Sequence, residues 1–173
     1  LIAGRFNPSG KLPISFPRSS AQLPCYYNQY SGWHGGKYMD VEEGSLYDFG
    51  YGLSFTTYEY ANLTLSQEVA SPEDVITVSV EVTNTGNRDG KEVVELYVND
   101  VISSVLTPTR VLKGFDKVFV RAGETVDVKF ELPVSSLSLI DADGESVVEP
   151  GEFEIMVGGG LDSLQKTILK VVK

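Results

Sequence analysis

From Tyr58 onward, apolar residues recur at every second position in short runs, and this alternation restricts what the chain can fold into. Val78, Val80 and Val82 alternate with polar residues, and the pattern returns over 94–99 and 126–132. A period of two places neighbouring side chains on opposite faces of a strand. Each run therefore predicts a strand with one buried face. No amphipathic helix of ordinary length interrupts the runs, which favours an all-β fold.

Turn-forming residues separate the runs. Clusters rich in Asn, Asp, Gly and Pro occur at 84–87, 122–124, 141–144 and 149–151, and these residue types favour tight turns. The predicted strands cover 61–66, 75–84, 91–99, 110–119, 124–132, 137–140, 145–148, 152–158 and 166–172. They predict an antiparallel β-sandwich of the immunoglobulin or fibronectin type III kind. Because the Cys…Trp…Cys pattern of antibody domains is missing, the fibronectin-III-like variant fits better.

Residues 1–54 form an irregular segment that precedes this sandwich. They contain four prolines and eight glycines and show no sustained helical or strand period, so regular structure should be sparse. Yet residues 1–50 hold nine of the eighteen aromatic residues, whereas disordered segments are poor in aromatics. We therefore expect this segment to lie against a surface.

Charge and residue counts exclude several classes of function. The chain carries 14 basic and 24 acidic side chains, a net charge of −10, which argues against a nucleic-acid partner. No apolar run approaches the roughly 20 residues that a membrane-spanning helix needs. A single cysteine and a single histidine argue against a cysteine-rich zinc site and a Ser-His-Asp triad. The first residue, Leu1, is not an initiator methionine, and the residues after it do not resemble a signal peptide. We therefore expect a fragment or the downstream piece of a processed protein.

Two motifs are specific enough to suggest a family. Residues 7–17 read Asn-Pro-Ser-Gly-Lys-Leu-Pro-Ile-Ser-Phe-Pro, and residues 47–56 read Tyr-Asp-Phe-Gly-Tyr-Gly-Leu-Ser-Phe-Thr. In this order and spacing they resemble the C-terminal region of glycoside hydrolase family 3, the β-glucosidase and β-xylosidase family. Residues 82–86, 90–98, 112–115, 122–124 and 149–151 also match, so the resemblance covers nearly the whole chain. Two positions depart from the family pattern: Asp48 stands where proline is usual, and Glu95 where glutamine is common.

The resemblance implies that the chain consists of two parts. Residues 1–54 would be the tail end of the second glycosidase domain and its linker, and 55–173 the fibronectin type III-like domain. The family consists of retaining glycosidases, which use two carboxyl groups about 5–5.5 Å apart. In the family both groups lie upstream of the 7–17 motif, so no catalytic, cofactor or metal residue is assigned here. The implied partner is the set of upstream catalytic domains, which would supply the contact with a carbohydrate substrate.

The acidic residues, the cysteine and the histidine are only weak candidates for a catalytic or metal-binding role within this chain. Glu81, Glu95, Asp127 and Glu131 are expected to face water on the polar sides of strands. The 141–145 segment has its glycine at the wrong position for a calcium loop, so an Asp-Gly turn is expected. Cys25 is expected to be a small apolar group, and His34 a solvated loop residue.

The aromatic cluster of the irregular segment is the most informative candidate. It comprises Tyr26, Tyr27, Tyr30, Trp33 and Tyr38. Flat aromatic rings pack well on a sugar face, so Tyr30, Trp33 and Tyr38 could form a substrate rim. The rings could instead pack the segment against the catalytic domains, and this second interpretation is favoured because an irregular segment needs packing to be ordered.

An independent carbohydrate-binding or cell-surface attachment module is the alternative function. Such a module would present exposed aromatics on a sheet face or at loop tips. Tyr97 is the best exposed candidate, while Phe115, Phe119, Phe130 and Phe153 stand at positions expected to be apolar. One tyrosine is a weak platform, so the sequence favours the structural part of a glycosidase.

Overall fold

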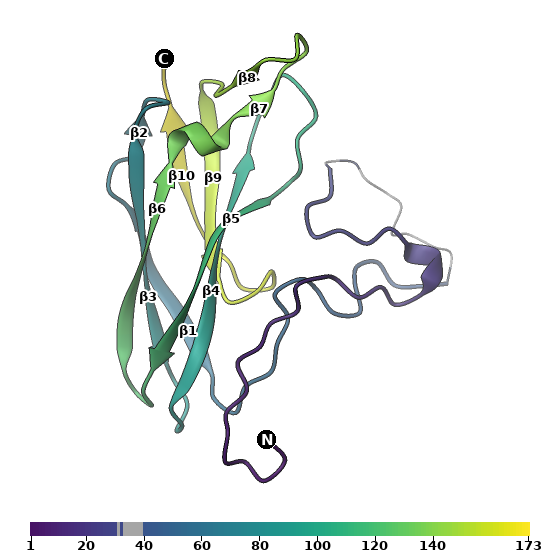
Figure 1. The fold of residues 1–173 in the computed structure, drawn as a ribbon, viewed down its shortest axis with the longest axis vertical. Helices are drawn as coiled ribbons and strands as arrows, with labels where there is room; N and C mark the ends of the chain where they lie inside the picture. The colour runs from purple at the N-terminus through teal and green to yellow at the C-terminus, as the bar shows by residue number, and fades with distance from the viewer. Residues whose placement is uncertain (31, 33–39) are drawn as a thin grey trace.

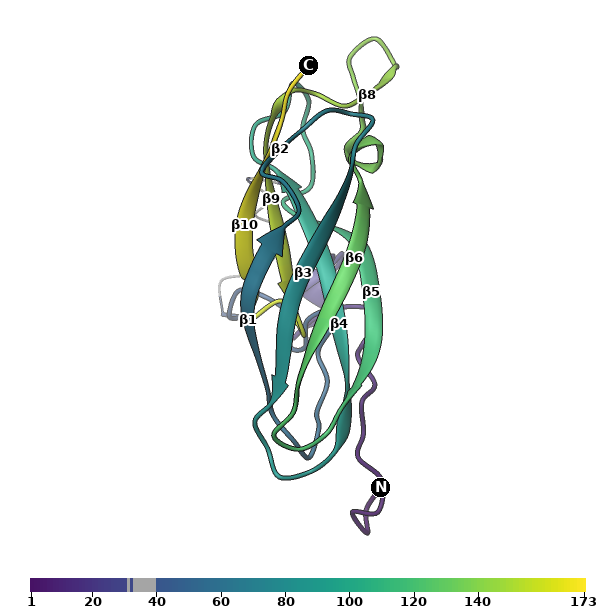
Figure 2. The same ribbon diagram turned by 90° about the vertical axis from the view of Figure 1, so that its left-hand side faces the viewer.

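Two sheets packed face to face form the body of the molecule (Figure 1; Figure 2). A computed structural model of the chain describes residues 1–30, 32 and 40–173. One sheet has the order β1-β3-β6, and the other has the order β2-β10-β9-β4-β5. Neighbouring strands are antiparallel except for the short parallel pair of β10 with β2. This is the expected sandwich of the fibronectin type III kind.

The strands follow the alternation closely. They are β1 (Tyr58–Leu65), β2 (Val69–Ala70), β3 (Val75–Asn84), β4 (Gly90–Asp100), β5 (Val111–Val120), β6 (Thr125–Pro133), β7 (Leu139–Ile140), β8 (Ser146–Val147), β9 (Gly151–Gly158) and β10 (Gln165–Val171). Two short 3-10 turns, η1 (Ser20–Gln22) and η2 (Val134–Leu137), are the helical elements of the described residues. In this part of the chain, no helix is long and apolar enough to cross a membrane.

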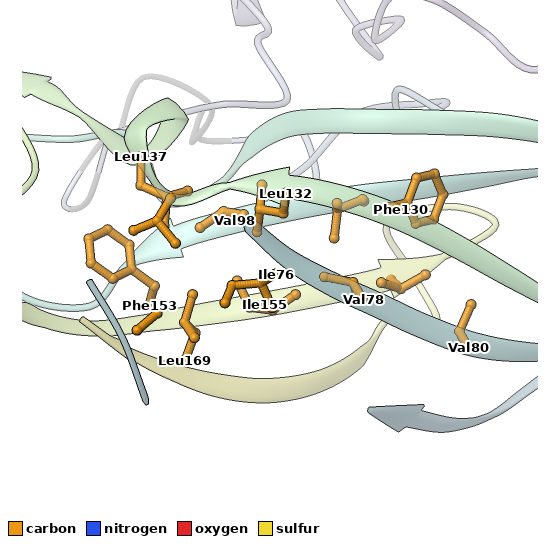
Figure 3. Close-up of a cluster of buried hydrophobic side chains, with 14 of the residues drawn as sticks. Ile76, Val78, Val80, Val98, Phe130, Leu132, Leu137, Phe153, Ile155 and Leu169 are labelled. Atoms are coloured by element: carbon orange, nitrogen blue, oxygen red, sulfur yellow. The ribbon is translucent and has the colours of Figure 1, made fainter. Parts of the chain in front are cut away.

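The core lies between the two sheets and is built from the apolar halves of the alternating runs (Figure 3). In β3, every second residue from Ile76 to Val82 is buried. Opposite them, Leu96 of β4 and Phe153 and Ile155 of β9 are almost fully buried. Burying such side chains stabilises the fold by about 1.5–3 kcal/mol each, so the alternation itself supplies the driving force for sandwich formation.

The 141–145 segment is the turn of the β7–β8 hairpin. The Asp141 carboxylate accepts hydrogen bonds from the Asp143 and Glu145 amides, each at 2.9 Å. Gly144 has a φ of +86°, a backbone conformation that glycine adopts without strain. The expected Asp-Gly turn is present, with the Asp141 carboxylate turned to its own backbone.

We call residues 1–54 the strap; its described residues stand against the outer side of the five-stranded sheet and extend away from it (Figure 1). Their described part contains one 3-10 turn and the isolated bridges Phe16–Tyr47 and Tyr30–Pro108. In Figure 2 the three-stranded sheet faces the viewer and the strap lies behind the sandwich. The strap is therefore sparse in regular structure, as its prolines and glycines predict.

Replacing Phe153 by alanine tests the core. Phe153 is 2% exposed, and truncating a buried phenylalanine costs about 3–5 kcal/mol. We expect chemical denaturation to show a loss of this size in the free energy of unfolding. The matched control is Ile140→Ala, because Ile140 is 61% exposed and should change stability by about 0.5 kcal/mol or less. Equal losses in the two variants would contradict this description of the core.

Candidate functional site: the junction of strap and sandwich

Asn7 ties the start of the strap to the sandwich entrance. Its side-chain oxygen accepts hydrogen bonds from the Phe55 amide at 2.8 Å and the Ser54 hydroxyl at 2.9 Å. Its side-chain nitrogen donates to the carbonyl of Asp89 at 3.1 Å. One amide side chain thus connects the first family motif, the second family motif and the loop before β4.

The two motifs then run side by side as the stem of the strap. The Leu12 amide donates to the Tyr51 carbonyl and the Gly50 amide donates to the Leu12 carbonyl, each at 2.9 Å. Farther out, the Phe16 amide donates to the Tyr47 carbonyl at 2.7 Å. Because residues 12–16 pair with 47–51, the two motifs form one structural unit although about 30 residues separate them.

A buried glutamine, Gln22, connects two parts of the strap by hydrogen bonds, in the region away from the sandwich (Figure 1). Gln22 is 2% exposed. Its side-chain nitrogen donates to the Glu42 carbonyl at 2.9 Å, and its oxygen accepts from the Arg18 amide at 2.7 Å. These bonds satisfy polar groups in a region without regular structure, where each unpaired group would cost stability.

Lys11 of the first motif forms an ion pair with Glu92 of β4. The Lys11 Nζ lies 3.3 Å from Glu92 Oε1, and both side chains are largely buried. The Tyr60 hydroxyl donates to the same carboxylate oxygen at 3.0 Å. Gly159 passes directly over this carboxylate, where a Cβ would collide with Glu92 Oε1. Glu92 is therefore enclosed by the strap, by β1 and by the loop after β9.

Glu95 is the second carboxylate beneath the strap. It is 4% exposed, and it accepts a hydrogen bond from the Tyr97 hydroxyl at 2.8 Å. Gly50 of the second motif lies on top of it with a φ of +79°, and a Cβ there would come within 2.5 Å of Glu95 Oε2. Glycine is required at this position for two reasons, the backbone conformation and the close approach.

Burial governs the protonation of both carboxyl groups. Desolvation raises the pKa of Glu92, and the nearby Lys11 ammonium only partly opposes it. Desolvation also raises the pKa of Glu95, while the hydrogen bond from Tyr97 lowers it and the Glu92 charge raises it further. Burial beside these carboxylates likewise raises the pKa of the Tyr60 and Tyr97 hydroxyls. The junction thus holds two buried acids near a single lysine.

Three aromatic rings pack beside the carboxylates. Tyr27 stacks on Phe49 with ring centroids 4.4 Å apart, and both rings contact Tyr97 at 6.1 and 6.5 Å. The Tyr27 hydroxyl accepts a hydrogen bond from the Leu112 amide at 3.4 Å. Such pairs contribute about 0.5–1.5 kcal/mol beyond the area that they bury, so the strap is fixed by packing as well as by charge.

A groove of about 510 Å³ lies where the strap leaves the sheet. Its lining includes Tyr26, Gln29, Asp48 and Arg110. The Thr109 amide and hydroxyl both donate to the Gln29 carbonyl, at 2.8 and 3.0 Å, and hold the strap to the β4–β5 connection. The groove is therefore a consequence of how the strap and this connection meet.

The structure places the sequence-predicted residues as follows. Tyr30 is about half exposed and forms a bridge with Pro108. Trp33, Tyr38 and His34 lie outside the described residues. Cys25 is partly buried, with its sulfur 3.3 Å from the Ser45 hydroxyl. Tyr27 packs on Phe49 and Tyr97 and so joins the strap to the sandwich, a contact that differs from the expected packing against the catalytic domains.

Four residues lie differently from the sequence expectation. Glu95 and Tyr97 were expected to face water, but both are buried because the strap covers the outer face of β4. Phe115 and Phe119 were expected at buried apolar positions, but they are 69% and 50% exposed. They stand on the outer face of β5, which the strap leaves open. For β4 the alternation identified the two faces correctly, but not that another segment covers the outer one. For β5 the expected face was wrong, because residues 111–120 do not alternate strictly and Gly114 and Val118 occupy the side that faces the core.

The sequence reasoning missed Lys11, Glu92 and Glu95 as a connected site. Lys11 and Gly50 lie in the two family motifs, and Glu95 departs from the usual glutamine. The motifs and the departure from glutamine point to these residues one by one in the sequence, but only the fold shows that they lie together.

An Asn7→Ala variant tests the attachment of the strap. Losing these hydrogen bonds should weaken the attachment by about 1–3 kcal/mol. Hydrogen exchange at the Phe55 amide should then accelerate about tenfold or more. The control is Asn87→Ala, an exposed turn residue, which should leave that rate unchanged. An unaltered Phe55 rate in the Asn7 variant would show that the strap is held without this side chain.

A Glu95→Gln variant tests the buried acid. Because folding raises the pKa of Glu95 above its ordinary value of 4.5, its contribution to stability is complete below about pH 4.5 and is lost as the pH rises through the folded value. Glutamine still accepts from Tyr97 but carries no charge. We expect the variant to be more stable than the parent at pH 7–8 and to lose less stability between pH 4.5 and 8.

Thermal or urea unfolding across this pH range provides the measurement. The control is Glu152→Gln, an exposed position of β9, which should follow the parent protein. Parallel pH curves for the parent and the Glu95 variant would show that Glu95 ionises normally in the folded chain.

Comparison with known proteins places this junction in a family. The description "Glycosyl hydrolase family 3 C-terminal domain" matches residues 1–55, and "Fibronectin type III-like domain" matches residues 92–160. The first match covers the strap and the second covers most of β4 through β9.

Individual relatives agree with these matches. The chain is 39% identical to a periplasmic beta-glucosidase of Salmonella typhimurium over 91% of its length, and 38% identical to a putative beta-xylosidase of Formosa agariphila over all of it. The solved beta-glucosidase of Listeria innocua in complex with glucose superposes with a TM-score of 0.92 at 33% identity, over 100% of this chain and 25% of that one. A b-glucosidase from Erythrobacter marinus gives a TM-score of 0.91 at 41% identity, over 96% and 22%.

The chain spans less than a quarter of the two curated relatives, 22% of one and 23% of the other. Its two matched segments occur in the order expected from the motifs at 7–17 and 47–56. The chain belongs to glycoside hydrolase family 3 and corresponds to the C-terminal region of its β-glucosidases and β-xylosidases.

Proposed function

We propose that this chain is the non-catalytic C-terminal part of a retaining β-glycosidase that removes terminal β-linked sugars from glycosides or oligosaccharides. Its role is to stabilise the catalytic domains. In this proposal residues 1–54 complete the second glycosidase domain and 55–173 form the fibronectin type III-like domain. The names of the relatives, beta-glucosidase and beta-xylosidase, support glucose or xylose as the sugar.

The observation that carries the proposal is that the strap is attached to the sandwich and yet exposes many large apolar residues. It is tied to the sandwich by Asn7, by Lys11 and by the rings of Tyr27 and Phe49, which contact Tyr97. Its exposed large apolar residues include Ile2, Phe6, Ile14, Phe16, Leu46 and Leu53. Soluble monomers rarely expose so much apolar surface in one region, and such surfaces mark interaction sites. The strap is suited to join the sandwich to a further body.

The buried carboxylates do not suit glycoside hydrolysis. A retaining pair must flank a sugar that can enter between the two groups. Glu92 is enclosed by Lys11, Tyr60 and Gly159, and Glu95 lies beneath Gly50. Their raised pKa values follow from the attachment of the strap, so we assign both to structure.

Tyr30, Trp33 and Tyr38 remain proposed as residues that pack against the catalytic domains or border their substrate site. The half-exposed Tyr30 is compatible with either role. Its bridge to Pro108 fixes the backbone from which the ring projects.

Aryl β-glucoside and aryl β-xyloside assays test the proposal. The chain alone should hydrolyse neither substrate, and the chain combined with the catalytic domains that precede it in the full enzyme should hydrolyse at least one. Hydrolysis by the chain alone would contradict the structural assignment. Inactivity of the combination, with binding of polysaccharide by the chain alone, would favour the carbohydrate-binding module.

A second measurement separates chemistry from structure. In the full enzyme, Glu95→Gln should leave kcat near the parent value at temperatures well below the unfolding midpoint. Loss of a catalytic carboxyl would instead lower kcat by orders of magnitude, since a general acid or base contributes about 10²–10⁴-fold. A large fall in kcat with an unchanged melting temperature would assign Glu95 to catalysis.

A further inference from the structure

The outer face of β5 carries two exposed phenylalanines. Gly114 faces the core, where an added Cβ would lie 3.3 Å from the Phe130 ring, so the next residue, Phe115, points outward. Phe119 lies four residues farther along the strand and shares this face, because alternate residues of a strand point the same way. Both rings are half or more exposed.

The outer face of the sheet becomes exposed between β4, which the strap covers at Glu95, and β5, which it does not cover at Phe115. Glu95 of β4 and Phe115 of β5 are direct cross-strand partners, so their side chains stand next to each other on one face. Glu95 is 4% exposed beneath the strap, whereas Phe115 is 69% exposed. The edge of the strap therefore passes between two adjacent strands and leaves the apolar member uncovered.

The beginning of the strap converges on the same end of β5. The Asn7 side chain binds the Asp89 carbonyl, and the Asp89 carboxylate accepts from the Ala122 amide, two residues after β5. Phe6, next to Asn7, is 63% exposed. The beginning of the strap consequently lies near the end of β5 that carries Phe119.

We propose that Phe115 and Phe119 form a second contact surface for the catalytic domain that the strap joins, so that this domain is held by the strap and by β5. The inference rests on the proposed function. Its occupant is the preceding part of the same enzyme, because the matched relatives are more than four times as long as the segment that this chain covers.

The charged residues near Phe115 and Phe119 indicate which charge the contacting surface of the catalytic domain should carry. Lys117 stands between them, and Lys91 is the cross-strand partner of Phe119; both lysines are exposed. This local positive charge contrasts with the net charge of −10 of the whole chain. The facing surface should therefore be apolar at its centre and acidic at its edge.

The test compares a Phe115→Ser/Phe119→Ser double variant with Ile168→Ser in two proteins, the chain alone and the full enzyme. Ile168 is 43% exposed on β10 and provides a matched apolar position in the same five-stranded sheet. Both variants should leave the melting temperature of the chain alone unchanged. In the full enzyme, the double variant should lower the unfolding midpoint by about 3 °C or more, and Ile168→Ser should not.

Two outcomes would overturn the inference. The first is a full enzyme whose midpoint is the same with and without the double variant. The second is a parent chain that dimerises in sedimentation and becomes monomeric only when the two phenylalanines are replaced, which would assign the face to a second copy. Either result is distinguishable from failure of the proposed function, because that failure would already appear as inactivity of the unmodified combination.

Discussion

The ion pair between Lys11 of the strap and the buried Glu92 of β4 is the interaction on which the arrangement of strap and sandwich depends. Taking a carboxylate out of water costs several kcal/mol unless charges and hydrogen bonds replace the solvent. At Glu92 the replacement comes from Lys11 and Tyr60, and at Glu95 from Tyr97. Lys11 belongs to the strap, so separation of the strap from the sandwich would remove the cation that pairs with Glu92.

This arrangement turns an irregular segment into a defined structural element. Backbone hydrogen bonds hold the two halves of the stem together, whereas side chains fix the position of the stem on the sandwich. Gly50 permits the close approach to Glu95, and Phe49 adds ring packing against Tyr27 and Tyr97. The strap thereby leaves the sandwich in a defined direction, and several of its large apolar residues are exposed.

The position of the strap also organises the outer face of the five-stranded sheet. It covers Glu95 and Tyr97 of β4 and leaves Phe115 and Phe119 of β5 exposed, so a covered region and an open apolar region lie side by side on one face. A domain joined to the strap would meet both the exposed apolar residues of the strap and the exposed rings of β5. In the proposed function, the sandwich contributes to the stability of the enzyme through these two regions.

The sequence by itself determined the long strands, most of the core and the family, but not the two-residue strand β2 or the 3-10 turn η2. Alternation in runs such as Val78–Val82 requires one apolar face to be buried, and residues 141–145 carry their turn in the Asp-Gly pair, so local chemistry was sufficient. The motifs at 7–17 and 47–56 identified the family from residue types alone. Only the tertiary structure decided that Glu95 and Tyr97 are buried while Phe115 and Phe119 are exposed. For Glu95 and Tyr97 the physical reason is that a period of two fixes the face on which a side chain stands, whereas its burial depends on a segment more than forty residues away that packs on that face. For Phe115 and Phe119 the reason is that residues 111–120 do not alternate strictly, so the face of these two rings was decided by the packing of β5.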